Sequence, residues 1–345
     1  MKTLATLFLM VLCTLKLAAQ TDAENLIKQG VALYDSGKFE EAIAKYKQSY
    51  AIDSNSAVLF SEMSMTYLQL QDYATAESLC KRAFDHFAGA SALKYIYDTY
   101  ASCLDEQGKT QEALAAYNKG ISLYPGFFEL YFNKAITLYN LKKPYEARTN
   151  FQMALKLNPD NTSSYLYLGF IEDGFGNRIP AIVCYSAYLL RRPEGEKAKK
   201  LLPYFITKVD SLYYYVKTGS STATMSSAGP RSDTTAYDYG TVESAMTLYY
   251  AMAAIEPEKD KEVLDHFKTN LTLLMELLAN ERKDHSNFYL DNLVPVFADM
   301  DKDKKIDGYI YYINSFENTD PTVQKLVKKH QREIDSFLKW YKNYR

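Results

Sequence analysis

The chain has 345 residues, of which 47% are hydrophobic and 24% are charged, so it holds ample apolar material for a folded core. The formal net charge of −2 argues against a nucleic-acid binder, because such proteins usually present a basic face. Tyrosine is frequent, with 31 Tyr against 17 Phe and 1 Trp, and its apolar ring with a polar tip suits amphipathic helices and binding faces alike.

The first residues predict a segment that directs export. Lys2 supplies a positive start, an apolar run follows over residues 4–15, and small residues end the segment at Ala19. This pattern is typical of a secretory signal peptide over residues 1–19, and the run is too short to span a bilayer. We therefore expect an exported protein in the periplasm or cell envelope of a Gram-negative bacterium, with no membrane insertion after cleavage.

From residue 23 onward the chain repeats a pattern of two amphipathic helices joined by a short turn. Ala42 has counterparts at intervals of 34, 37, 34 and 34 residues, which indicates a helical repeat array. Small residues recur where the two helices of each unit would cross, because backbones approach closely only there. These crossing residues are Gly30, Ser64, Ala101, Ala135 and Gly169. The five units span residues 23–56, 57–90, 94–127, 128–161 and 162–195.

This pattern resembles the tetratricopeptide repeat (TPR) family over residues 23–195. The matching residues of the first and fourth units are Gly30, Leu33, Gly37, Phe39, Ala42, Tyr46, Leu138, Ala147, Phe151, Ala154 and Pro159. The resemblance implies an all-α fold, a right-handed superhelical solenoid of five helix hairpins. Glu172 departs from the pattern, since an apolar residue is usual at its position in the fifth unit.

The resemblance also implies a concave face, lined by the first helix of each unit, that holds a peptide or a partner's helix. Its predicted lining is Ile27, Val31, Tyr34, Ser61, Met65, Leu68, Asp98, Ser102, Asp105, Phe132, Ile136, Tyr139, Leu166 and Phe170. We expect a hydrophobic or aromatic segment as the partner, with a basic residue near Asp98. Ile27, Val31 and Glu62 stand where chaperone-binding relatives place Lys and Asn, so that specificity is absent. Coverage of part of this face by the C-terminal half remains open.

The rest of the chain predicts further helices. Residues 196–216 form one more amphipathic helix, expected to cap the array, and residues 217–240 are rich in Ser, Thr and Gly, as in a flexible linker. A second all-helical region follows over residues 241–345, in which no family is recognised. Its predicted helices lie at about 241–255, 260–281, 285–299, 305–316 and 321–343.

The sequence offers few sites for chemistry. No phosphate loop, nucleophile elbow or Cys/His pairing occurs, so we expect no enzyme activity and no cofactor. Asp299, Asp301 and Asp303 form a weak calcium candidate, because the sharp-turn glycine and the closing glutamate of a calcium loop are missing. Cys80, Cys103 and Cys184 give no disulfide framework, although a bridge between the first two stays open.

Two functions follow from these observations. The first is an exported, non-enzymatic scaffold or adaptor that binds a protein or peptide, and no nucleic acid, through the concave face. The second is an enzyme or small-ligand binder whose site lies in the C-terminal helical region, with the repeats as a docking arm. A pocket that brings Asp or His side chains together from residues 285–307 would favour the second. The oligomeric state stays open.

Overall fold

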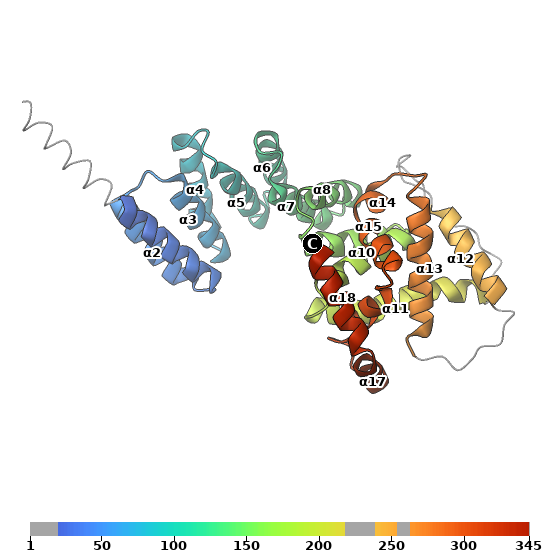
Figure 1. The fold of residues 1–345 in the computed structure, drawn as a ribbon. Helices are drawn as coiled ribbons and strands as arrows, with labels where there is room; N and C mark the ends of the chain where they lie inside the picture. Colours follow the sequence, from blue (N-terminus) through green and yellow to red (C-terminus); the bar gives the residue numbers. More distant parts are fainter. Residues whose placement is uncertain (1–19, 218–238, 254–262, 345) are drawn as a thin grey trace, which may run out of the picture. The chain divides into compact units, whose positions relative to one another are not determined.

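The computed structural model of the chain describes residues 20–217, 239–253 and 263–344, and these residues form helices and no strand (Figure 1). The predicted all-α fold class is therefore confirmed for the described part of the chain. The predicted signal peptide and most of the predicted linker lie outside the described residues. The chain falls into two compact units, which divide between Met153 and Ala154.

The first unit consists of helix hairpins. Residues 20–35 form its first helix. The helices that follow are α2 (Phe39–Ile52), α3 (Ala57–Gln69), α4 (Tyr73–His86), α5 (Leu93–Glu106), α6 (Thr110–Leu123), α7 (Phe128–Asn140) and α8 (Pro144–Leu157), the last of which crosses the division between the units. Side-chain caps fix two of the helix starts: the Ser56 hydroxyl accepts from the amide of Leu59 at 3.3 Å, and Asp72 accepts from that of Thr75 at 3.2 Å.

The turn inside each hairpin contains one residue in the left-handed backbone region. Gly37, Gly108 and Gly176 occupy this position with φ of 75°, 76° and 79°. Gln71 and Lys142 occupy it in the other two turns, with φ of 61° and 58°. These five residues repeat at the spacing of the alanine series, so the turn geometry is periodic even where glycine is absent.

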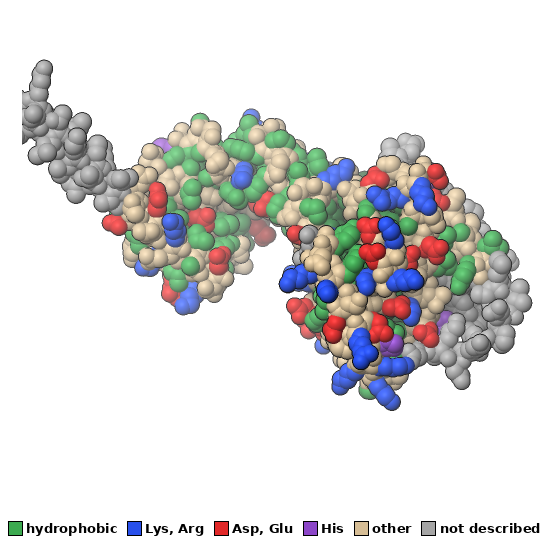
Figure 2. Space-filling model, in the orientation of Figure 1, with side chains coloured by type: hydrophobic (Ala, Val, Ile, Leu, Met, Phe, Trp, Pro, Cys, Tyr) green, Lys and Arg blue, Asp and Glu red, His purple; other side chains and the backbone are tan. Residues whose placement is uncertain are grey.

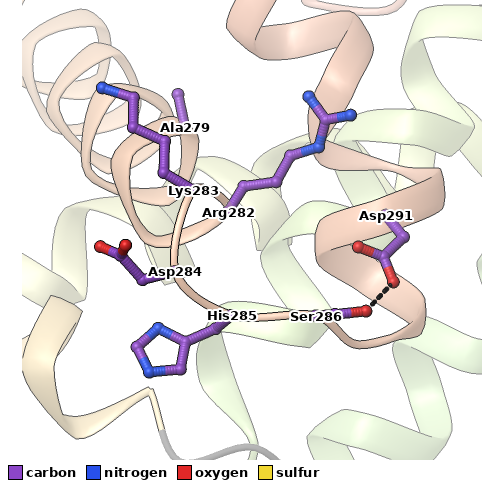
Figure 3. Close-up of a pocket in the computed structure, with 7 residues that line it drawn as sticks. All are labelled: Ala279, Arg282, Lys283, Asp284, His285, Ser286 and Asp291. Atoms are coloured by element: carbon purple, nitrogen blue, oxygen red, sulfur yellow. Dashed lines mark hydrogen bonds between the residues drawn. The ribbon is translucent and has the colours of Figure 1, made fainter.

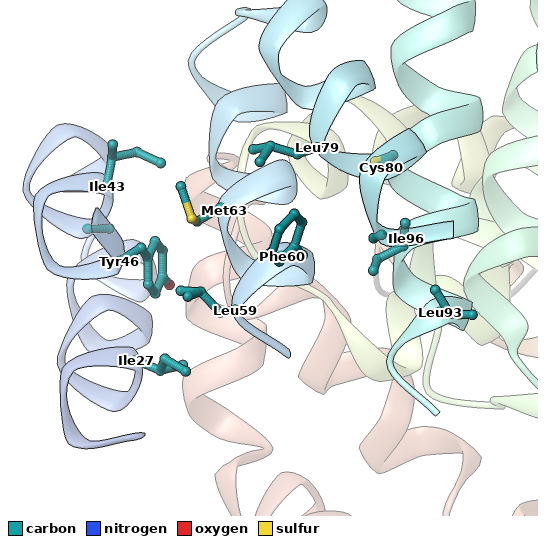
Figure 4. Packing of buried hydrophobic residues seen from close by; sticks show 12 residues of the cluster. Ile27, Ile43, Tyr46, Leu59, Phe60, Met63, Leu79, Cys80, Leu93 and Ile96 are labelled. Atoms are coloured by element: carbon teal, nitrogen blue, oxygen red, sulfur yellow. The ribbon is translucent and has the colours of Figure 1, made fainter. Parts of the chain in front are cut away.

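Small residues let the two helices of a hairpin cross closely. A Cβ atom added to Gly30 would lie 2.7 Å from Cδ1 of Tyr46, and one added to Gly169 would lie 2.6 Å from Cδ1 of Tyr185. Both tyrosine side chains are fully buried. Figure 4 shows Tyr46 and Leu59 converging in the core of the first unit. The close crossings predicted from the small residues are thus present.

The second unit begins with a fifth hairpin and continues into the C-terminal helices. Its helices are α9 (Thr162–Gly174), α10 (Arg178–Arg191), α11 (Glu196–Lys217), α12 (Gly240–Ala253), α13 (Asp265–Glu281), α14 (Phe288–Asn292), α15 (Val294–Lys302), α16 (Ile306–Asn314), α17 (Pro321–Lys329) and α18 (Gln331–Tyr344). Two helices predicted as continuous are divided here. The segment predicted at 285–299 breaks at Leu293, just before Pro295, and the one predicted at 321–343 breaks at His330, so that α17 and α18 can both contact α16.

The fifth hairpin packs together with the C-terminal helices. Every residue of α10 from Ile179 to Leu190 is buried, and α10 contacts α9, α11 and α16. The hydroxyl of Tyr309 on α16 donates to the Ser186 carbonyl at 3.0 Å. Helix α11 contacts α12 and α13 as well as α10, so C-terminal helices cover the helix that was expected to cap the array. The boundary that the sequence suggested at residues 217–240 accordingly falls inside the second unit.

Glu172 connects the fifth hairpin to the C-terminal helices. Its side chain is buried in α9, where the repeat pattern would place an apolar residue. Its carboxylate accepts hydrogen bonds from the Tyr289 hydroxyl of α14 and, at 2.6 Å, from the Asn177 amide. A buried carboxylate without partners is costly, so these donors explain how the chain tolerates the departure from the pattern.

Replacing Tyr289 with Phe is expected to lower the free energy of unfolding of the second unit by about 2 kcal/mol, because Glu172 then loses a buried donor. The Glu172→Leu, Tyr289→Phe double variant should lose less than the sum of the single changes, since both polar partners leave together. Trp340 is the single tryptophan and lies in α18, so its emission during denaturant unfolding reports on this unit. If the losses in free energy of unfolding of the two single variants add up in the double variant, the proposed coupling is wrong. Tyr95→Phe in α5 is the control, and it should leave the unfolding midpoint followed by Trp340 emission unchanged.

Candidate partner-binding face

The helices that lead the four hairpins of the first unit carry most of the predicted binding residues. We call these helices (residues 20–35, α3, α5 and α7) the leading helices. Within this unit α3 contacts α5, and α5 contacts α7. The predicted residues that are neither fully buried nor fully exposed form the surface that we call the leading face: Val31, Tyr34, Met65, Leu68, Asp98, Ser102, Asp105, Phe132, Ile136 and Tyr139.

Some predicted lining residues belong to the core instead. Ile27 is only 8% exposed and packs in the cluster that contains Tyr46 and Leu59. Ser61 in the first unit and Leu166 in the second are also buried. These side chains support the leading helices and offer little surface to a partner.

Polar side chains join α5 to α7 across the leading face. The Asn133 amide donates to both carboxylate oxygens of Asp98, at 2.9 and 3.0 Å, and the Thr137 hydroxyl donates to Asp105 at 2.7 Å. Burial of the carboxyl group raises the pKa of Asp98 to about 7, and the charge of Glu129 acts in the same direction. Asp98 is thus occupied by a neighbour and is only partly ionised at neutral pH, so it is a poor anchor for the basic group expected beside it.

Sequence reasoning missed Asn133 and Thr137 as partners of the two acids. They follow Asp98 and Asp105 by 35 and 32 residues, close to the repeat period. Residues one period apart occupy neighbouring leading helices, so this offset was the signal that could have paired them.

Phe170, the last predicted lining residue, is 42% exposed on α9 of the second unit. Its ring contacts those of Tyr167 and Tyr185, at centroid distances of 6.4 and 6.1 Å. Asp173 lies beside this aromatic group, where it accepts from the Tyr185 hydroxyl at 3.2 Å and pairs with Lys208 of α11. Phe170 is therefore part of an aromatic surface whose neighbouring carboxylate already has a cation.

The weak calcium candidate lies at the end of α15, and its carboxylates face the last helix. Tyr344 donates to Asp299 at 3.0 Å, and the Trp340 indole donates to Asp303 at 2.7 Å. Burial raises the pKa of Asp301. Among the described residues no group of three His, Cys, Asp or Glu side chains is placed to hold a metal ion. Two of these acids thus accept hydrogen bonds from side chains of α18.

The three cysteines in the described part of the chain are free and buried. Burial raises the pKa of the Cys80 thiol above its ordinary value and that of Cys103 to about 12. The bridge left open between Cys80 and Cys103 is absent from the structure, and both thiols act as small apolar core residues.

A pocket of about 500 Å³ lies between α13 and α14 in the second unit (Figure 3). It is lined by Ala279, Arg282, Lys283, Asp284, His285, Ser286 and Asp291. The Ser286 hydroxyl donates to Asp291 at 2.6 Å, and His285 pairs with Glu281 at 3.0 Å. A nucleophilic serine would need its hydroxyl bonded to the histidine, so the observed pairing is not that of a catalytic triad.

The surface charge is mixed, with one basic region on the second unit. Figure 2 shows Lys and Arg side chains gathered at the end formed by α17. The exposed basic residues there are Lys325, Lys328, Lys329 and Arg332, opposite the buried Val323, Leu326 and Val327. This distribution of buried apolar and exposed basic residues makes α17 amphipathic. In the described part of the chain, no helix combines the length and the apolar character that crossing a membrane requires.

Two stretches of the chain match models of a known family, and the second of them crosses the division between the two units. Residues 95–127 and residues 128–161 each match a model described as tetratricopeptide repeat. These stretches correspond to the hairpins α5–α6 and α7–α8, at the repeat boundaries predicted from the alanine series.

Whole-chain similarities are weaker. The chain is 24% identical over 194 residues to the protein O-mannosyl-transferase TMTC1 of Homo sapiens, a match that covers 55% of this chain and 21% of that protein. It is 23% identical over 178 residues to the type IV pilus assembly protein PilF of Pseudomonas aeruginosa, covering 51% of this chain and 69% of that protein.

A solved structure of Pseudomonas aeruginosa PilF aligns with 70% of this chain and 95% of its own, at 15% identity and a TM-score of 0.47. The helix hairpins, their periodic turns and the two family matches agree with one another. The chain therefore carries tetratricopeptide repeats, and it continues into a further helical region after them.

Proposed function

We propose that this protein is an exported, non-enzymatic adaptor that binds a protein or peptide segment through the leading face. The observation that carries the proposal is the set of half-exposed apolar and aromatic side chains on three of the four leading helices, with Asp98 and Asp105 on α5 between them. Tetratricopeptide arrays present such surfaces for extended segments, and aromatic residues are enriched in the centres of interfaces. The signal-peptide pattern of residues 1–19 supports export, and the similarity to a protein named for pilus assembly agrees with a role at the cell envelope.

Substitution of Tyr34, Phe132 and Tyr139 by alanine is expected to lower the recovery of partners from envelope extract by about tenfold, because it removes large contact areas from the leading face. The matched control replaces Ile52, Leu123 and Tyr145, which are exposed on the second helices of the hairpins. Circular dichroism melting of both variants checks that they fold. Equal recovery of every partner by the two triple variants would refute the proposal.

The pocket between α13 and α14 favours a second candidate function, a small-ligand binder or enzyme with the repeats as a docking arm. Its lining includes His285 and Asp291, two residues of the stretch 285–307 in which that hypothesis places its site. The pairing of Ser286 with Asp291 and the exposed lining support the adaptor instead. If the adaptor function is right, a His285→Ala, Asp291→Ala variant recovers the same partners from envelope extract as the unsubstituted chain does.

A further inference from the structure

Helix α17 carries a concentration of positive charge on its exposed face. Residues 321–332 contain four basic residues and no Asp or Glu, whereas the whole chain has a formal net charge of −2. Lys328 and Lys329 follow Lys325 by three and four residues, the spacing that places side chains on one face of a helix. We call the four exposed basic residues the basic stripe: Lys325, Lys328, Lys329 and Arg332. They lie at one end of the second unit (Figure 2).

The opposite face of α17 holds this stripe in place. Val323, Leu326 and Val327 are buried, and α17 contacts α16. The helix start is capped by Asp320, whose carboxylate accepts from the Thr322 amide at 2.7 Å. Because the apolar face is already covered, the surface that α17 offers to a partner is the basic one.

The acids that follow the stripe along the chain have side-chain partners of their own. Glu333 pairs with His330 at 3.1 Å, and the ring of His330 stacks on that of Tyr311 at a centroid distance of 4.3 Å. Asp335 accepts from the Gln331 amide at 3.0 Å. Residues 321–335 hold four basic side chains against these two acids, so the local charge is positive.

We propose that the basic stripe binds the anionic headgroups of a lipid bilayer, as a peripheral contact without insertion. Each Lys or Arg close to an anionic bilayer adds to the attraction, and the contributions of several such residues sum. A bilayer is flat, so an exposed helix face can bring its cations to the headgroups together, whereas a peptide segment is commonly held in a groove or at a sheet edge. Phe316, 43% exposed in the connection between α16 and α17, adds an apolar group that the interface of a bilayer accepts.

The test is co-sedimentation of the full chain with lipid vesicles. One set of vesicles contains phosphatidylcholine alone, and the other contains about one third phosphatidylglycerol, which is anionic. We expect much stronger binding to the anionic set at about 50 mM salt, and loss of this difference at about 500 mM salt, where charges are screened. Association through the apolar run of residues 4–15 would be the same for both sets, so the comparison separates it. Equal binding to the two sets at low salt would overturn the inference.

The variant that tests the stripe is Lys325→Glu, Lys328→Glu. It should bind anionic vesicles at least about tenfold more weakly, because each reversal removes an attraction and adds a repulsion. The matched control, Lys47→Glu, Lys119→Glu, makes the same change in net charge at exposed positions of α2 and α6 in the first unit. It should change binding by less than about twofold, since screening confines the attraction to nearby charges.

The unfolding midpoint followed by Trp340 emission checks that the second unit of each variant is folded. If the two double variants bind anionic vesicles equally well, net charge and not the stripe governs the binding, and the inference is wrong.

Two further measurements separate a bilayer from other anions. Polyglutamate stands for an acidic protein segment, and inorganic phosphate, exchanged for chloride at constant ionic strength, stands for a single phosphate group. We expect a higher dissociation constant per acidic group for polyglutamate than for the anionic vesicles, and no displacement from the vesicles by phosphate. Tighter binding to polyglutamate would assign the stripe to an acidic protein, and displacement by phosphate would assign it to a small anion; either result would overturn the bilayer contact.

This inference goes beyond the proposed function and does not depend on the leading face. The Tyr34, Phe132, Tyr139 triple variant keeps the basic stripe, so it should bind anionic vesicles as the unsubstituted chain does. Loss of vesicle binding in that folded variant would place the bilayer contact on the leading face and would refute its assignment to α17.

Discussion

Replacing Gly308 with alanine is expected to lower the free energy of unfolding of the second unit by about 3 kcal/mol. Gly308 lies in α16 at its crossing with α18. A Cβ atom there would overlap the carbonyl oxygen of Glu333 and would lie 2.6 Å from Cβ of Phe337. Glu333 contributes a backbone atom and Phe337 is fully buried, so neither can yield without a shift of the whole of α18.

The measurement is denaturant unfolding followed by Trp340 emission, because α18 carries this residue and would be the helix displaced. Gly174→Ala is the matched control: it lies at the end of α9 in the same unit, and nothing stands within 4 Å of the added atom. The control should be neutral or slightly stabilising, since alanine is the better helix former. Equal midpoints for the two variants would show that α16 and α18 are not as closely packed as described.

Replacing Asp98 with asparagine is expected to change how the stability of the first unit depends on pH. The pKa of Asp98 rises from 3.8 to about 7 on folding, chiefly because the carboxyl group is buried. The folded state then binds more protons than the unfolded state between about pH 4 and pH 7, so this group's contribution is present at acid pH and is lost as the pH rises through that window. The asparagine side chain carries no charge, and its carbonyl oxygen can still accept a hydrogen bond from Asn133.

We therefore expect the Asp98→Asn variant to be more stable than the unsubstituted chain at pH 8, by up to a few kcal/mol, and to lose that advantage near pH 4. Melting curves by circular dichroism across this range give the difference directly. Glu62 and Glu129, whose pKa values are also raised, are present in both proteins and cancel in the comparison. Trp340 emission should be the same in both, because it reports on the second unit; a constant stability difference across the range would contradict the assignment to Asp98.

The repeat architecture could be predicted because it depends on local properties that recur. Each hairpin needs a small crossing residue, such as Gly30 beneath Tyr46, and one left-handed turn residue such as Gly37. Contacts within a repeat and between adjacent repeats are short in sequence, so a period near 34 residues carries most of the information about the fold. The same periodicity identified the leading face, although it did not separate the buried Ile27 from the half-exposed Val31.

The pairing of particular polar groups could not be read from the pattern. The sequence predicted that Asp98 would bind a basic group of the partner. In the structure its carboxylate instead accepts hydrogen bonds from the Asn133 amide. The sequence also treated Glu172 as an irregularity, whereas it accepts from Tyr289, which lies 117 residues away. Hydrogen-bond geometry depends on distances of a few tenths of an ångström, and neither residue type nor spacing specifies those.

By itself, the sequence determined that this protein is a helical repeat array followed by a second helical region, because short-range packing and turn geometry repeat along the chain. The tertiary structure alone decided that the fifth hairpin shares a compact unit with the C-terminal helices, and that α10 is buried on all sides. It also decided which buried carboxylates accept hydrogen bonds from neighbouring side chains. These features arise from contacts between segments far apart in sequence, such as that of Tyr309 with Ser186. The repeat pattern describes only packing within a repeat and between adjacent repeats, so it does not predict such contacts.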